Sequence, residues 1–77
     1  MSNFELVATG LLRGGGYHYR LEDGTNLIVS RANTPDRGDE TMIFPADAEG
    51  NVTDWGELYA GYGITQEDAL LKYLEYH

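Results

Sequence analysis

Hydrophobic and polar residues alternate at the start of the chain with the period of two that is typical of β-strands. In residues 3–12, Phe4, Leu6 and Ala8 share one face of the predicted strand. Residues 17–21 repeat the alternation after a run of three glycines, which suits a connection between antiparallel neighbours because glycine has wide backbone freedom. We therefore expect a first strand over 3–12 and a second over 17–21.

Asp23 and Gly24 form the strongest local signal, because they separate two β-rich runs as the central pair of a two-residue hairpin turn would. A type I′ turn, with positive φ at both residues, predicts a hairpin over 17–32. Its second arm contains three consecutive apolar residues at 27–29. An unbroken apolar run favours a strand that is covered on both faces, so this strand should be central in the sheet.

A polar loop is expected over 33–39, where Pro35 lacks an amide donor and is surrounded by Asn, Asp and Gly. The alternation resumes over 40–46, which predicts the next strand. Pro45 indicates that this strand ends there or lies at an edge of the sheet. Residues 47–51 have the composition of a turn.

Helical signals begin after this turn. Asp54 is placed to cap a short helix over Trp55–Ala60, with glycines at 61 and 63 ending it. A second and clearer helix should follow Thr65, since Thr65 is a good N-cap and the next residues are acidic. Residues at helical spacing give that helix an apolar stripe: Leu70, Leu71, Tyr73, Leu74 and His77.

The order of these elements predicts a single α+β domain over residues 1–77. We expect a four-stranded antiparallel meander with a C-terminal amphipathic helix packed on one face. With so little chain to bury, Phe44, Trp55 and Leu70 are assigned to the core.

The chain has a net charge of −8, with thirteen acidic and five basic residues among 77. The charge is confined to one half, because residues 1–35 sum to zero and all the excess lies in 36–77. A direct nucleic-acid ligand is not expected, since binding phosphates requires clustered Lys and Arg. An acidic surface can instead steer a basic partner, and the alternative is that it only keeps the protein soluble.

Candidate chemistry is sparse. The glycines at 14–16 are not followed by the Gly-Lys-Ser/Thr of a phosphate-binding loop, and a calcium loop starting at Asp47 would have Val52 and Leu58 where Gly and Glu are required. His18 could serve as a base, but a surface histidine on the exposed face of its strand is the simpler interpretation. No enzyme, metal or cofactor is expected.

The chain has no cysteine, and neither a signal peptide nor a membrane span is expected from its residues. These features favour a protein of the cytoplasm that has no disulfides and does not bind a membrane.

The second half resembles small uncharacterised reading frames of tailed bacteriophages. These carry an ETM-I/V-F strand, a Trp-x-Glu-Leu stretch, a Tyr and a short acidic helix. The matching residues are Glu40, Thr41, Met42, Ile43, Phe44, Trp55, Glu57, Leu58, Tyr62, Glu67 and Ala69. The resemblance covers about half of the chain and transfers no catalytic residues. It implies a phage accessory protein, of a kind that often binds and blocks a host protein in the host cytoplasm.

We therefore expect a small acidic protein that blocks a basic host factor, such as a nucleic-acid-binding defence component whose phosphate ligands its acids would mimic. The alternative is a structural or regulatory phage protein that self-associates, as a homodimer, through a sheet edge. A hydrolase or ligand-binding domain has no supporting residues. The predicted partner-binding residues are Asp36, Asp39, Glu40, Asp47, Glu49, Asp54, Glu57, Tyr59 and Tyr62.

Overall fold

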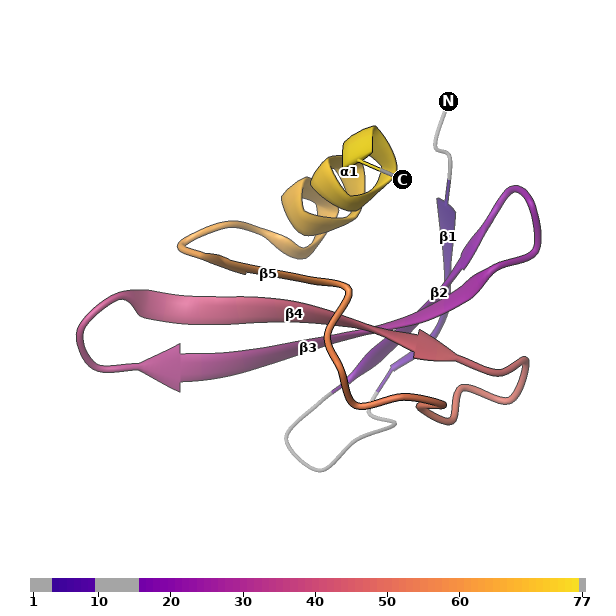
Figure 1. The fold of residues 1–77 in the computed structure, drawn as a ribbon, viewed down its shortest axis with the longest axis horizontal. Helices are drawn as coiled ribbons and strands as arrows, with labels where there is room; N and C mark the ends of the chain where they lie inside the picture. Colours follow the sequence, from indigo (N-terminus) through magenta and orange to yellow (C-terminus); the bar gives the residue numbers. More distant parts are fainter. Residues whose placement is uncertain (1–3, 10–15, 77) are drawn as a thin grey trace.

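Each strand of the sheet pairs with the strand that precedes it in the chain, so the sheet is an antiparallel meander (Figure 1). The computed structural model describes residues 4–9 and 16–76. Within them, five strands and one helix are formed: β1 Phe4–Thr9, β2 Tyr17–Leu21, β3 Asn26–Thr34, β4 Gly38–Ala46, β5 Tyr59–Tyr62 and α1 Gln66–Tyr76. The parts of the first predicted strand and of the glycine run that fall on residues 3 and 10–15 lie outside the described residues.

The β2–β3 hairpin is confirmed, but its turn differs from the predicted type. The amide of Leu21 donates to the carbonyl of Thr25 at 2.8 Å, and the amide of Gly24 donates to the carbonyl of Leu21 at 3.0 Å. Only Gly24 has a positive φ, of 90°, whereas Asp23 accepts a hydrogen bond from the Thr25 amide at 2.9 Å. The loop therefore has three residues and ends in a left-handed glycine, a common hairpin alternative to type I′.

The β3–β4 hairpin is longer than predicted, because the strands extend into most of the expected loop over 33–39. Asn33 lies opposite Asp39, and its side-chain amide donates to the Asp39 carboxylate at 3.0 Å. Gly38 closes the turn with a φ of 83°. Pairing between side chains thus stabilises strand ends whose composition is typical of a loop.

The sheet has five strands rather than the predicted four, and the expected short helix over Trp55–Ala60 is wrong. The Leu58 amide donates to the carbonyl of Ile43 at 2.7 Å, and β5 then pairs with β4. Gly56 is a poor helix former, and a helix here would leave the free edge of β4 unpaired. Pairing with β4 therefore makes this segment a strand and not a helix.

One face of the sheet, here called the helix face, packs against α1 and holds the main core. Cross-strand pairs place Tyr19 beside Leu27 and Val29 beside Ile43, and Leu70 of the helix packs against them. Leu27, Val29, Ile43 and Leu70 are completely buried. Figure 1 shows α1 lying across this face.

The opposite face, here called the outer face, has a second and smaller buried cluster. His18, Ile28 and Phe44 are cross-strand neighbours on β2, β3 and β4. Ile28 is fully buried, as predicted for a central strand covered on both faces. His18 is only 2% exposed, so the prediction of a surface histidine is wrong. Its Nε2 lies 2.8 Å from Oδ1 of Asn26, which gives the buried ring a polar partner.

The predicted C-terminal helix is confirmed with its cap, since Oγ1 of Thr65 accepts a hydrogen bond from the Asp68 amide at 3.1 Å. The buried stripe is narrower than predicted, because Leu71 is 52% exposed whereas Ala69 and Leu70 are fully buried. His77, assigned to the same stripe, lies outside the described residues. No helix in the described part of the chain combines the length and the apolar character needed to cross a membrane.

Candidate interaction surface

Apolar side chains form a strip along β4 and β5 on the outer face. Met42 pairs with Ala60, Phe44 lies two residues further along β4, and Tyr62 lies two residues beyond Ala60. Trp55 joins them from the segment that connects the two strands, with its ring 5.3 Å from that of Phe44 at an angle of 64°. We call these five residues the outer-face strip.

Trp55 is the most exposed residue of the strip. It was predicted to lie in the core, but 65% of its surface is accessible. The edge-to-face contact with Phe44 is the geometry that aromatic rings prefer, and it leaves much of the indole free while Phe44 is buried. Trp55 therefore covers the smaller core and presents a large apolar area to solvent.

The other end of the strip already holds a cation. The guanidinium carbon of Arg37, in the β3–β4 turn, lies 5.2 Å from the centre of the Tyr62 ring. Tyr62 is 42% exposed and lies opposite Glu40 on β4. An aromatic ring next to a carboxylate attracts a guanidinium or ammonium group through the ring quadrupole and by charge.

Four of the nine predicted site residues lie at or beside this strip. Glu40 and Tyr62 are cross-strand neighbours on the outer face. Asp54 and Glu57 are exposed on either side of Trp55 in the chain. The structure thus brings aromatic and acidic side chains together around Trp55 and Tyr62.

Two predicted residues lie on the helix face instead. Asp39 accepts hydrogen bonds from Asn33 and from Arg31, whose Nη2 is 3.5 Å from the carboxylate. Tyr59 packs against the main core, because strand alternation turns it away from Ala60 and Tyr62.

The remaining three acids lie in turns. Asp36 is exposed in the β3–β4 turn, and Glu49 in the turn after β4. Asp47 shapes the second turn, since its Oδ1 accepts hydrogen bonds from the amides of Glu49 and Asn51 at 3.0 and 2.9 Å. The Asn51 amide is the largest cause that holds the pKa of the Asp47 carboxyl below its usual value.

Sequence reasoning missed the two most useful members of the strip, Trp55 and Met42. Trp55 was assigned to the core because it is large and apolar, although Asp54, Gly56 and Glu57 around it are typical of an exposed segment. Met42 belongs to the predicted strand over 40–46 and to the phage pattern, and neither indicates an exposed surface. Their contribution depends on β5, which the sequence did not predict.

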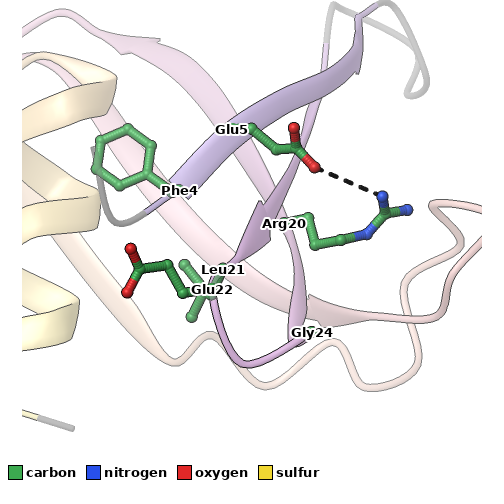
Figure 2. Close-up of a pocket in the computed structure, with 6 residues that line it drawn as sticks. All are labelled: Phe4, Glu5, Arg20, Leu21, Glu22 and Gly24. Carbon is green, nitrogen blue, oxygen red and sulfur yellow. Dashed lines mark ion pairs between the residues drawn. The ribbon is translucent and has the colours of Figure 1, made fainter. Parts of the chain in front are cut away.

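A separate cavity of about 350 Å³ lies where β1 meets the β2–β3 turn (Figure 2). Its lining residues are Phe4, Glu5, Arg20, Leu21, Glu22 and Gly24. Glu5 and Arg20 form an ion pair at 3.6 Å across it. The other charged group of the lining is the Glu22 carboxylate. Within residues 4–9 and 16–76, no group of three or more His, Asp or Glu side chains could hold a metal ion.

Comparison with known proteins gives no relative: no protein family, curated protein or solved structure matches this chain. The resemblance to phage reading frames therefore stays a prediction.

Proposed function

We propose that this protein binds a partner protein through the outer-face strip and covers a basic surface of that partner. The observation that carries the proposal is the exposure of Trp55 and Tyr62 on one face, 65% and 42%, with Glu40, Asp54 and Glu57 around them. Tryptophan and tyrosine are the residues that most often anchor protein interfaces.

Charge supports a basic partner in particular. Residues 36–57 contain seven acids and one arginine. Carboxylates at the rim of an apolar patch raise the rate of encounter with a basic surface, while the buried aromatic anchors supply most of the affinity. The strip has both parts of this arrangement.

The biological role that we propose follows from the phage resemblance. A small acidic phage protein of this form would block a host protein, for example a nucleic-acid-binding defence factor whose basic site it occupies. No catalysis is involved in this proposal, because binding alone removes the host factor from its own ligand.

The experiment compares affinity purifications from a bacterial host lysate with three tagged variants. Trp55→Ala and Tyr62→Ala remove the anchors, and Leu71→Ala is the control because Leu71 is an equally exposed apolar residue on the helix. We expect a partner that wild type and Leu71→Ala retain and that the two strip variants lose. A partner retained equally by all the folded variants would contradict the proposed function.

A further inference from the structure

The last strand of the sheet has a free edge. β5 follows β4 in the sheet order and has no further neighbour among the described residues. The Gly63 amide donates to the carbonyl of Asp39 at 2.9 Å, and the register continues through Gly61 opposite Thr41. Because bonded pairs alternate in an antiparallel ladder, the backbone groups of Ala60 and Tyr62 point away from β4.

The two edges of the sheet differ in how they are protected. β1 carries a register irregularity between Leu6 and Ala8, and the charged Glu5 lies on the same strand. Bulges and charges are the devices by which proteins prevent strands from pairing at an edge. The four residues of β5, Tyr59–Tyr62, contain no charge, no proline and no bulge. This edge therefore carries none of those devices.

The residues around β5 indicate that an added strand would carry positive charge. Glu57 precedes β5 by two residues, and Glu40 lies opposite Tyr62 on the outer face. The guanidinium group of Arg37 already lies over the Tyr62 ring, which shows that this end of the strip accommodates such a group. A strand added beside Ala60 and Tyr62 would place alternate side chains next to these acidic and aromatic groups.

We propose that the partner adds an extended, arginine- or lysine-bearing segment to the edge of β5. The inference rests on the proposed function and defines how the same surface takes its partner. Backbone hydrogen bonds to Ala60 and Tyr62 provide part of the affinity, and basic side chains that reach the outer-face strip provide the selectivity.

A second copy of this chain is the other occupant of a free edge. Pairing of two copies would bring together two chains that each have a net charge of −8 and acidic residues close to the β5 edge. Like charges across an interface oppose association, so the charge favours a basic partner over self-pairing.

The key variant is Ala60→Pro. Proline removes the outward amide of residue 60 and leaves the bonds of Tyr59 and Gly61 to β4, and edge strands tolerate proline for this reason. Leu71→Ala is the control, since Leu71 is exposed on α1 and is not part of the outer-face strip or of β5. Thermal melts and an amide spectrum establish that both variants are folded.

The probe is a fluorescent heptapeptide of alternating arginine and valine. It is compared with a glutamate–valine version and with two N-methylated versions, one methylated at every valine and the other at every arginine. Only one of these two sets of amides can face β5, so one methylated peptide should lose binding and the other should keep it. These peptides test the edge with the unmodified protein.

We expect the arginine peptide to bind at least about tenfold more tightly than the glutamate peptide, because a tenfold ratio needs only about 1.4 kcal/mol. Ala60→Pro should weaken binding about tenfold, which is the effect of one lost hydrogen bond, whereas Leu71→Ala should leave it within about twofold of wild type. The amide signals of Ala60 and Tyr62 should move on titration.

Equal binding by wild type and Ala60→Pro, or by the parent and both methylated peptides, would overturn strand addition. If Trp55→Ala and Tyr62→Ala still lost the host partner in that case, the proposed function would stand without strand addition. If the edge were needed for the peptide while Trp55→Ala and Tyr62→Ala kept the host partner, the proposed function alone would fail. A concentration-dependent dimer of wild type that Ala60→Pro abolishes would overturn the basic occupant in favour of a second copy.

Discussion

Gly61 shows how one residue determines the local packing at the sheet edge. A methyl group built at Gly61 would lie 2.6 Å from Cδ1 of Ile64 and 3.1 Å from the hydroxyl of Tyr59. The Tyr59 ring and Ile64 thus lie against the bare backbone at this position, and both pack against the main core. Glycine permits this close approach and does not provide an unusual backbone angle, because its φ is not positive.

Gly61→Ala should therefore lower the free energy of unfolding by about 1–3 kcal/mol, the usual effect of overpacking. Gly56→Ala is the control, since the nearest atom to its added methyl would be Oδ1 of Asp54 at 3.4 Å, an ordinary contact. Its effect should stay within about 0.5 kcal/mol of zero. Urea denaturation measures both, and equal values for the two variants would contradict the packing argument.

Tyr19 connects the sheet to the start of the helix. Its hydroxyl donates to Oε1 of Gln66 at 2.9 Å. Burial is the main cause that raises the pKa of Tyr19 above its usual value of about 10, and the Glu67 carboxylate adds to the effect. Ionisation is thus harder in the folded protein than in the unfolded chain.

Stability should consequently fall as the pH rises above about 10, because the unfolded chain then releases the Tyr19 proton before the folded protein does. Tyr19→Phe should cost about 0.5–1.5 kcal/mol at neutral pH through the lost hydrogen bond, and should reduce the loss at alkaline pH. Denaturant melts at pH 7 and above pH 10 would test it. An unchanged alkaline slope in the variant would show that another group is responsible.

Among the elements, those with local signals could be predicted and those that depend on distant pairing could not. Thr65 and the acidic residues after it specify the start of α1 within a few residues, and Asp23 with Gly24 specifies a hairpin. β5 is different, because its conformation depends on β4, which lies about 20 residues earlier in the sequence. The same missing strand explains why the sequence placed Trp55 in the core.

Among the side chains of α1 whose burial the structure describes, Leu70 is the one large side chain that is fully buried in the core. Leu70→Ala should lower the free energy of unfolding by about 2–5 kcal/mol, as cavities in a core usually do. Leu74 is half-buried, so Leu74→Ala should cost less than Leu70→Ala. Leu71→Ala is the exposed control on the same helix, and a loss as large as that of Leu70→Ala would mean that the helix packs through another face.

At the scale of the whole molecule, the excess negative charge and the outer-face strip belong to the same half of the chain. The excess negative charge lies in the half of the chain that forms β4, β5 and the segment between them. Three of the described basic residues are otherwise engaged, since Arg20 pairs with Glu5, Arg31 with Asp39, and Arg37 with the Tyr62 ring. A basic partner would therefore approach the outer face of β4 and β5 first.

Reversing Glu40 and Glu57 to Lys should slow association with the arginine peptide more than it speeds dissociation, because rim charges act mainly on the encounter. The control reverses Glu22 and Glu75, two exposed acids away from the outer-face strip, and changes the net charge by the same amount. Stopped-flow measurements across salt concentrations give both rates. Equal slowing by the two variants would show that only the net charge matters.

The meander has a further consequence for how the chain folds. Consecutive strands pair with each other, and only short loops join β2 to β3 and β3 to β4. The longer closures are the pairing of β5 with β4, across residues 47–58, and the docking of α1, which joins Tyr19 to Gln66 across 47 residues. Each hairpin can consequently form from nearby residues, whereas the helix can reach its final position only on a sheet that already presents β2.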